Sequence, residues 1–412
     1  MRIAMVSEHA DPTAALGGED AGGQNVHVAA LACGLAARGH SVTVYTRLAG
    51  PDATPTGELA PGVQVRRLPA GPAAPLPKDE LLPHMAEFGD GLRREWDLCP
   101  PDIVHAHFWM SGLAALRGAE GRPFPVAQTF HALGSVKARH QGAKDTSPPG
   151  RVDAECQVGL DCDQVIATCT DEVRELAFLG IPRSKVSVIP CGVDTSTFSP
   201  GGPAAQRTGR ARLLVLGRLV ERKGIDTAIA ALARLPGTEL VVAGGPDLAA
   251  LPSDAEYRRL RDAAQACGVA DRVVFTGAVS RQQVPALVRS ADVVVCTPWY
   301  EPFGIAPLEA MSCGVPVIAS AVGGLTDSVV RGTTGLLIPA RDPDALAAAA
   351  RTLLADPAIR AAYGNAGVRR ARRWYSWQRV ATQTENVYLR LAASVPPDTD
   401  AAEGRSLVVG AQ

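Results

Sequence analysis

Several signatures of common protein classes are missing from this 412-residue chain. Its nine cysteines form no Cys-x-x-Cys pair and their number is odd, which is unlike a disulfide framework or a paired-thiol zinc site. Neither a Gly-x-Gly-x-x-Gly fingerprint nor a Walker phosphate loop occurs, and the missing fingerprint counts against a dehydrogenase. We therefore expect reduced, mostly buried thiols.

The chain also lacks an excess of charge of either sign, and it has no long hydrophobic run. Forty-one basic and 42 acidic residues leave a net charge of −1, which argues against a general binder of nucleic acid or anionic membranes. The first residues turn polar too early for a signal peptide, and no uncharged apolar stretch reaches the roughly 18 residues of a transmembrane helix. We expect a cytoplasmic protein with no transmembrane segment and no nucleic-acid partner.

What the chain does have is an alternation of short apolar segments with helical patterns, which is typical of βαβ units and parallel sheets. In the first half, predicted strands cover residues 3–6, 42–45, 63–68, 103–106, 126–130, 165–167 and 186–189, and predicted helices cover 24–38, 79–98, 153–161 and 171–179. In the second half, strands are predicted at 213–216, 240–243, 273–276, 293–296, 317–319 and 336–338, and the last helices at 343–355, 358–373 and 377–392. The pattern therefore predicts two α/β domains in tandem.

A change of composition separates the two series of elements. Residues 190–212 are rich in Pro, Gly, Ser and Thr, which is typical of an interdomain linker. We predict a first Rossmann-like domain over 1–195, a linker over 196–212, a second Rossmann-like domain over 213–375, a final helix over 376–394 and a loose tail over 395–412.

Two carboxylates lie in the segment that connects a predicted buried strand to the following helix. Glu301 and Glu309 bracket a segment that follows the strand at 293–296. In open α/β sheets this edge binds ligands, carboxylates accept hydrogen bonds from sugar hydroxyls, and a helix start suits a phosphate. Each residue alone could be an ordinary surface carboxylate, and the pair alone could suggest the acid and base of a glycosidase.

Two further loops supply glycine and positive charge after a strand. The first contains Gly22, Gly23 and Asn25, and its glycines would let the backbone approach a phosphate, although a flexible connecting loop explains them equally well. The second places Arg218 and Lys223 after the strand at 213–216, where they could clamp a diphosphate. Their position at the carboxyl end of a strand favours this role over that of solvated surface cations.

Histidines end two predicted strands of the first domain. His105 and His107 alternate at the end of the strand at 103–106, and His131 follows the strand at 126–130, so His107 and His131 could lie together. The spacing is wrong for common zinc motifs. For His131 we rank contact with a substrate first, a structural role second and a metal ligand third.

A basic cluster follows His131 in an otherwise neutral chain. Lys137, Arg139, His140 and Arg151 could hold a negatively charged substrate, and a solvated loop is the alternative for Lys137 and Arg139. Arg151 opens a predicted helix, where a cation is mildly unfavourable, so another role is expected for it.

Together these segments resemble family 4 of the retaining nucleotide-sugar glycosyltransferases, whose GT-B architecture has two Rossmann-like doubly wound domains facing each other across a cleft. The matching motifs are Gly22-Gly23, Gly217-Arg218…Lys223-Gly224, Glu301-Pro302-Phe303-Gly304…Glu309-Ala310, Gly314-Val315-Pro316-Val317, Gly323-Gly324 and Gly332-x-x-Gly335. They span nearly the whole chain in the family's order. The combination is specific to the family and not to a substrate.

The resemblance implies that a nucleotide sugar binds mainly to the second domain and that the final helix returns to the first. Glu309 would bind the ribose, Glu301 the sugar hydroxyls, and Arg218 with Lys223 the diphosphate. The remaining implied contacts are the amides of Phe303, Gly304 and Ile305, the loop of Gly22, Gly23 and Asn25, and His131 beside the transferred sugar. The departing phosphate would accept the acceptor's proton, so that Arg218, Lys223, Glu301 and His131 form the catalytic set and no metal or other cofactor is required.

Within the family, the first domain is similar to the inositol-phosphate N-acetylglucosaminyltransferases of the mycothiol pathway and to sucrose-phosphate synthases. In the former, a lysine, a tyrosine, a threonine and an arginine hold the acceptor phosphate. Lys78 and Arg151 match, but Phe108 replaces the tyrosine and Ala132 the threonine, and each lost hydrogen bond would weaken phosphate binding by roughly 1 kcal/mol or more. These four residues, with His107 and Lys137, form the predicted acceptor site.

The resemblance leaves the substrates open. UDP is the commoner donor nucleotide and GDP the alternative, the sugar is of the hexose type, and a small polar acceptor could attack through oxygen or sulfur, as in an antibiotic or small-thiol pathway of secondary metabolism. A catalytically silent nucleotide-sugar-binding protein is the alternative from another class, although Arg218, Lys223 and Glu301 are all present. The oligomeric state, with a homodimer as one option, and the amplitude of domain closure are not readable from the sequence.

Overall fold

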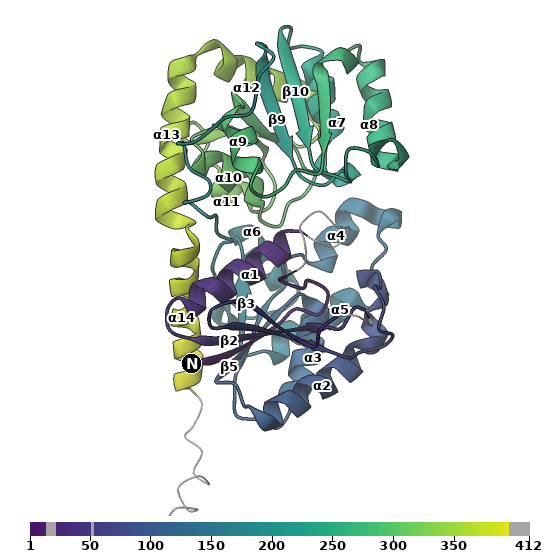
Figure 1. The fold of residues 1–412 in the computed structure, drawn as a ribbon, viewed down its shortest axis with the longest axis vertical. Helices are drawn as coiled ribbons and strands as arrows, with labels where there is room; N and C mark the ends of the chain where they lie inside the picture. The colour runs from purple at the N-terminus through teal and green to yellow at the C-terminus, as the bar shows by residue number, and fades with distance from the viewer. Residues whose placement is uncertain (14–21, 51–52, 395–412) are drawn as a thin grey trace, which may run out of the picture.

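The computed structural model describes residues 1–13, 22–50 and 53–394, which form two α/β domains stacked along the long axis of the molecule (Figure 1). Within these residues, the first sheet has the strand order β3-β4-β2-β1-β5-β6-β7-β8, and the second has the order β11-β10-β9-β12-β13-β14. Every pairing is parallel except that of β3 with β4. The predicted pair of doubly wound domains is confirmed.

The strands of the first sheet are β1 (Arg2–Val6), β2 (Ser41–Arg47), β3 (Thr56–Ala60), β4 (Val63–Leu68), β5 (Ile103–His107), β6 (Val126–Thr129), β7 (Gln164–Ala167) and β8 (Val186–Val188). Those of the second are β9 (Ala211–Leu216), β10 (Thr238–Ala243), β11 (Val273–Gly277), β12 (Val293–Cys296), β13 (Val317–Ser320) and β14 (Gly335–Ile338). The central strands β5, β6, β10 and β13 are buried at every residue, which is why they read as apolar runs in the sequence. The edge strand β3 is not fully buried and lacks such a run, and the sequence did not predict it.

The helices of the first domain are α1 (Gly23–Ala36), α2 (Met85–Leu98), α3 (Trp109–Ala119), α4 (Gly134–Gln141), α5 (Arg151–Asp161) and α6 (Thr170–Phe178). The helix predicted at 79–98 begins only at Met85, because Pro83 falls in the second of two short 3-10 turns, η1 (Lys78–Glu80) and η2 (Leu82–His84). Helices α3 and α4 were not predicted. Helix α3 begins directly after Phe108, and α4 begins two residues after Ala132, so both follow residues that the sequence singled out for chemistry.

The helices of the second half are α7 (Ile225–Leu232), α8 (Ala255–Ala266), α9 (Val284–Arg289), α10 (Ile305–Ser312), α11 (Leu325–Ser328), α12 (Pro343–Ala355), α13 (Pro357–Trp374) and α14 (Trp377–Ala393). Helices α13 and α14 run along one side of both domains, and α14 lies against α1 (Figure 1). A Cβ atom at Gly34 of α1 would come within 3.0 Å of Ala381, and Tyr388 of α14 is hydrogen-bonded to His105 of β5. The last helix therefore packs on the first domain.

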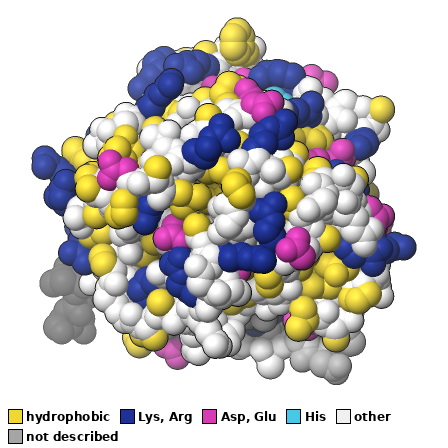
Figure 2. Space-filling model, turned by 90° about the horizontal axis from the view of Figure 1, so that it is seen from above, with side chains coloured by type: hydrophobic (Ala, Val, Ile, Leu, Met, Phe, Trp, Pro, Cys, Tyr) yellow, Lys and Arg dark blue, Asp and Glu magenta, His cyan; other side chains and the backbone are white. Residues whose placement is uncertain are grey.

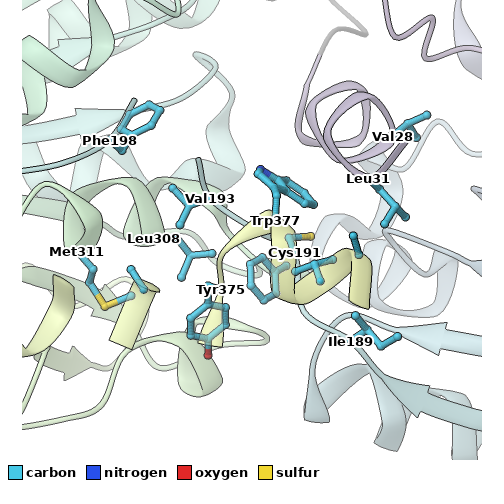
Figure 3. Close-up of a cluster of buried hydrophobic side chains, with 14 of the residues drawn as sticks. Val28, Leu31, Ile189, Cys191, Val193, Phe198, Leu308, Met311, Tyr375 and Trp377 are labelled. Atoms are coloured by element: carbon cyan, nitrogen blue, oxygen red, sulfur yellow. The ribbon is translucent and has the colours of Figure 1, made fainter. Parts of the chain in front are cut away.

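The hydrophobic core is continuous across the junction of the domains. One buried cluster contains Val28 and Leu31 of α1 together with Leu308 and Met311 of α10, and Trp377 lies between the two groups (Figure 3). The chain crosses this junction twice, and Val193 donates its N–H to the carbonyl oxygen of Tyr375 at 2.7 Å. Apolar packing thus connects the domains beside the cleft.

All nine cysteines are free, and only Cys99 is exposed. Seen from above, Lys and Arg side chains are interspersed with acidic and hydrophobic ones and do not merge into one patch (Figure 2). Among the described residues, no helix is both long and apolar enough to span a membrane. The predicted tail at 395–412 lies outside the described residues.

Candidate active site

A cavity lies between the carboxyl ends of the two sheets. On the side of the first domain it is lined by Ala132, Leu133 and Val136, which follow β6, and by residues that follow β7. On the side of the second domain it is lined by residues that follow β12 and β13: Tyr300, Glu301, Pro302, Val322 and Gly323. This edge of a parallel sheet is where α/β proteins bind ligands.

Glycine geometry shapes the loop that carries Glu301. Gly304 immediately precedes α10 and has φ +84°, a backbone conformation that L-residues rarely adopt. Gly324 donates its N–H to the carbonyl oxygen of Glu301 at 3.1 Å. A Cβ atom at Gly323 would lie only 2.0 Å from the same oxygen. The two glycine motifs of the second domain therefore depend on each other, because the lack of side chains at Gly323 and Gly324 lets their segment pass close to the loop that carries Glu301.

Cations surround the Glu301 carboxylate. Lys223 forms an ion pair with its Oε2 atom, and Arg222 Nη1 lies 4.0 Å from the same oxygen. Burial alone would raise the pKa of Glu301, but Lys223, Arg222 and Arg218 outweigh burial and lower it. Glu301 is therefore an ionised hydrogen-bond acceptor at neutral pH.

Glu309 lies in the second turn of α10 and is only 5% exposed. Its Oε1 atom pairs with Arg281, whose guanidinium also stacks on the ring of Phe198 at 4.5 Å. Arg218 lies in the loop after β9, beside the 3-10 turn η5 (Glu221–Lys223). The structure thus gathers Arg218, Lys223, Glu301 and Glu309 at one edge of the second sheet.

The glycine loop of the first domain reaches this edge from the other side. A Cβ atom at Gly23 would lie 3.5 Å from the side chain of Ile305, so the N-terminus of α1 faces that of α10. The Asn25 side chain accepts a hydrogen bond from the N–H of Gly22 at 3.1 Å and donates one to the carbonyl oxygen of Asp11 at 3.0 Å. The preceding residues of this loop, including Gly17 and Gly18, lie outside the described residues.

The predicted approach of two histidines is confirmed. His107 Nδ1 lies 3.0 Å from His131 Nε2, because β5 and β6 are neighbours in the sheet. His107 is completely buried, whereas His131 is only partly buried, so the structure puts His107 behind His131 rather than on the cleft surface. Burial, reinforced by the neighbouring imidazoles, lowers the pKa of both rings well below 6.5. Among the described residues, no group of three or more His, Cys, Asp or Glu side chains is placed so that it could hold a metal ion.

Backbone strain marks the same edge of the first domain. Phe108 has φ +83° and His131 has φ +61°, and they are two of the three non-glycine residues with positive φ in the described chain. Such conformations cost about 1–3 kcal/mol each and cluster at functional sites. The two residues end adjacent strands, so the strain supports a site here independently of any motif.

Two of the three predicted acceptor cations, Arg151 and Lys137, are engaged by protein groups. Arg151 Nε donates to Glu155 at 2.8 Å, and its Nη2 donates to the carbonyl oxygen of Ala132 at 2.8 Å. Lys137 Nζ lies 3.0 Å from Asp145 Oδ1. Lys78 begins η1, which lies in the same part of the first domain: its neighbour Asp79 is 3.9 Å from Lys137 Nζ.

Some residues at the cleft were not predicted from the sequence. Arg222 directly precedes Lys223 and could have been included with it, whereas the pairing of Arg281 with Glu309 carries no local signal. Contacts between the domains were also missed. Cys169 donates its S–H to the carbonyl oxygen of Pro302 at 3.1 Å, and Thr170 donates its N–H to Asp327 at 2.6 Å.

Two parallel α/β domains facing each other across a cleft, with carboxylates and cations at the carboxyl ends of the strands, are the architecture of GT-B glycosyltransferases. Family comparisons agree with this class. Residues 21–197 match the model described as Glycosyltransferase Family 4, and residues 203–370 match the one described as Glycosyl transferases group 1. The chain belongs to glycosyltransferase family 4 and is an enzyme of that class.

Relatives and solved structures match nearly the whole chain. The chain is 36% identical to the D-inositol 3-phosphate glycosyltransferase of Acidothermus cellulolyticus over 406 residues, covering 94% of this chain and 90% of the relative. It is 37% identical to the enzyme of the same name from Kineococcus radiotolerans, with 94% and 95% covered. The structure of sucrose-phosphate synthase from Thermosynechococcus elongatus superposes with a TM-score of 0.88 at 33% identity, covering 95% of this chain and 99% of that one. The resemblance seen in the sequence is therefore confirmed.

Proposed function

We propose that this glycosyltransferase moves a hexose-type sugar, with retention of its anomeric configuration, from a nucleoside diphosphate sugar to a small polar acceptor. The observation that carries the proposal is the position of Glu301. Its ionised carboxylate is paired with Lys223 at the start of α10 and lines the cavity opposite Ala132, the residue that follows His131. A sugar placed in this cavity would lie between the two domains.

The donor would be held mainly by the second domain. The ribose hydroxyls would donate to Glu309, and the diphosphate would meet Arg218, Lys223 and the unpaired N–H groups at the start of α10. Gly304 supports this arrangement, because it is the N-cap residue of α10 and its positive φ sets the backbone conformation at the start of the helix. UDP is the first nucleotide to test and GDP the second.

The reaction needs no covalent intermediate on the enzyme. The bond between the anomeric carbon and the β-phosphate oxygen breaks, and the acceptor oxygen or sulfur bonds to the same face of that carbon. The acceptor's proton passes to the departing phosphate oxygen, which gives the glycoside and a nucleoside diphosphate. Lys223 and Arg218 would stabilise the negative charge that develops on the leaving group. Such electrostatic stabilisation is usually the largest single contribution to an enzyme's rate acceleration.

The test is a transfer assay with UDP- and GDP-hexoses and a panel of small polyols and thiols. Product identity would be read by mass spectrometry and the anomeric configuration by NMR. The proposal expects an α-linked product from an α-linked donor. An inverted product would contradict retention, and the absence of turnover with every nucleoside diphosphate sugar would contradict the reaction itself.

For the acceptor, we propose a small polar molecule without a phosphate group. Arg151 and its partner Glu155 are buried, with side chains 5% and 0% exposed, and separating such a pair to bind a phosphate is costly. Phe108 and Ala132 supply no hydroxyl group to compensate, and Lys137 is occupied by Asp145. The first domain is thus better suited to a neutral polyol.

Paired acceptors test this choice directly. We would compare myo-inositol with D-inositol 3-phosphate, the substrate named for the curated relatives, using one donor. The proposal expects the phosphate to give no higher kcat/KM than the neutral compound. A large preference for the phosphate would contradict it and would assign the relatives' acceptor to this enzyme.

A further inference from the structure

A cluster of buried imidazoles packs against His131, the residue that precedes Ala132 of the cavity lining. The ring of His107 is 5.2 Å from that of His131 and 4.1 Å from that of His105, and the ring of His27 is 5.0 Å from that of His131. His27 lies on α1, His105 and His107 lie on β5, and His131 lies two residues after the end of β6. Only His131 among them is not classed as buried. The donor and acceptor roles proposed above leave the other three without a function.

The protonation of His105 follows from its hydrogen bonds. Thr129 Oγ1 donates its single proton to the carbonyl oxygen of Ile166 at 3.0 Å, so it can only accept from His105 Nε2 at 2.9 Å. His105 Nδ1 is then unprotonated, and Tyr388 donates its O–H to it at 2.7 Å. Both nitrogens of His105 are therefore used, and neither is available to His107.

The hydrogen bond between His107 and His131 has two possible polarities. In one, His107 Nδ1 carries the proton and donates it to His131 Nε2; in the other, His131 donates. His107 Nε2 is buried without a partner in the described part of the chain. In the second case this atom would be an orphaned N–H, whereas in the first it is an unpaired acceptor, and buried N–H groups without partners are the rarer of the two.

We propose that His107 donates its Nδ1 proton to His131 Nε2 and thereby holds His131 in the form that carries a proton on Nδ1. His131 Nε2 is committed to His107 at 3.0 Å, and no partner for His131 Nδ1 is found among the described residues. The Nδ1–H group of the partly buried His131 ring is therefore the one left for a ligand in the cavity that the adjacent Ala132 lines. His107 acts as a positioning residue, not as a residue that touches the substrate.

A neutral N–H donor suits the proposed chemistry, on which this step of the inference rests. It can donate to a hydroxyl oxygen of the transferred sugar without placing a positive charge beside the electron-poor anomeric carbon. Burial and the neighbouring rings keep the pKa of His131 well below 6.5, so the ring stays uncharged at neutral pH. A positively charged His131 would repel the positive charge that develops on the sugar in the transition state.

The first experiment reads the tautomer itself. The full-length protein is labelled with ¹⁵N-histidine, and the imidazole nitrogens are observed by NMR at neutral pH, with His107 and His131 assigned by single substitutions. We expect a protonated Nδ1 and an unprotonated Nε2 on His131. A proton on His131 Nε2 would overturn the proposal, whatever reaction the enzyme catalyses.

The second experiment tests the consequence for turnover with two matched variants. His107→Asn keeps a nitrogen donor at the same position, and His107→Leu removes it while filling the space. We expect kcat of His107→Leu to fall about tenfold, as for the loss of one hydrogen bond in the site, with most of the rate restored in His107→Asn. KM for the donor should change little, because the nucleotide is held by the second domain.

Melting temperature and nucleotide binding serve as controls for folding. Equal kcat values for the Asn and Leu variants would overturn the positioning role. If the wild-type protein turned over no nucleoside diphosphate sugar, the proposed function would fail, and the NMR result would still decide the tautomer. If His107→Leu did not fold, His107→Asn and the NMR spectrum would still decide the proposal.

Discussion

The two faces of the cleft are built from different chemistry. All eight histidines of the chain lie within its first 140 residues, and the second domain contains none. The face of the second domain combines glycine-rich loops with Lys and Arg side chains that pair with Glu301 and Glu309, whereas the first domain combines its paired cations with neutral imidazoles. Ion pairs occur on both faces, so the difference lies in the imidazoles, which only the first domain supplies, while the side that would hold the diphosphate relies on permanent charge alone.

The largest test of this contrast is Lys223→Ala in the second domain. Loss of the cation beside Glu301 should lower turnover by about 10²–10³-fold, because developing charge on the leaving group loses its partner. The matched control is Lys144→Ala, since Lys144 pairs with Glu221 and its side chain is 73% exposed. Steady-state kinetics at unchanged melting temperature would be compared. A folded Lys223→Ala enzyme with wild-type turnover would remove the charged half of the contrast.

A second test disturbs the geometry of the second domain without changing its charge. In Gly323→Ala, the new Cβ atom would lie 2.0 Å from the Glu301 carbonyl oxygen at a φ of +49°, so the Glu301 loop must move. Displacing a positioned group by about 1 Å can cost about 100-fold in rate, and we expect a loss of this order in kcat/KM for the donor. Gly201→Ala is the control, because no atom lies within 4 Å of its Cβ position. Equal kinetics of the two variants would show that the loop does not depend on this close approach.

A third test uses acid against the first domain. Burial lowers the pKa of His27 to about 4 and that of His105 to about 3. The unfolded chain therefore binds these protons first, and stability present above pH 6.5 is lost as the pH falls from 6.5 towards 4. The loss should be about 2 kcal/mol for His27 at pH 5. Hydrogen exchange, corrected for intrinsic rates, should show the first domain loosening before the second, and a uniform response would contradict the contrast.

The smallest expected effect is that of a chelator. If Arg218 and Lys223 stabilise the leaving diphosphate, EDTA should leave turnover unchanged. The assay is the transfer reaction with and without EDTA, followed by added Mg²⁺. Activity that disappears with EDTA and returns with Mg²⁺ would mean that these side chains do not suffice.

The sequence indicated which residues of the second domain lie together at the cleft, because backbone geometry leaves a direct mark on the motif there. Gly304, Gly323 and Gly324 are required by a positive φ or a close approach, so the motif itself encodes the loop that carries Glu301. The parallel strands were readable for a similar reason, since burial on both faces gives continuous apolar runs. Among the strands of the first sheet, only the weakly buried edge strand β3 (Thr56–Ala60) was not predicted.

The first domain's half could not be read in the same way, because its properties depend on partners distant in sequence. Arg151 was expected to be available to an anion, yet Glu155 and the carbonyl oxygen of Ala132 already bind it. The proximity of His107 and His131 followed from strand order, but the complete burial of His107 did not. The strained backbone of Phe108 gives no signal in composition or spacing.

Hydrogen exchange of the wild-type protein with and without a nucleoside diphosphate tests the central claim most directly. UDP, or GDP if UDP does not bind, should slow exchange in the segments around 217–224 and 301–310 and leave the buried histidine strands of the first domain unchanged. NAD should have no effect. Protection confined to the first domain, equal protection by NAD, or no protection by either nucleotide would contradict the assignment of the donor to the second domain.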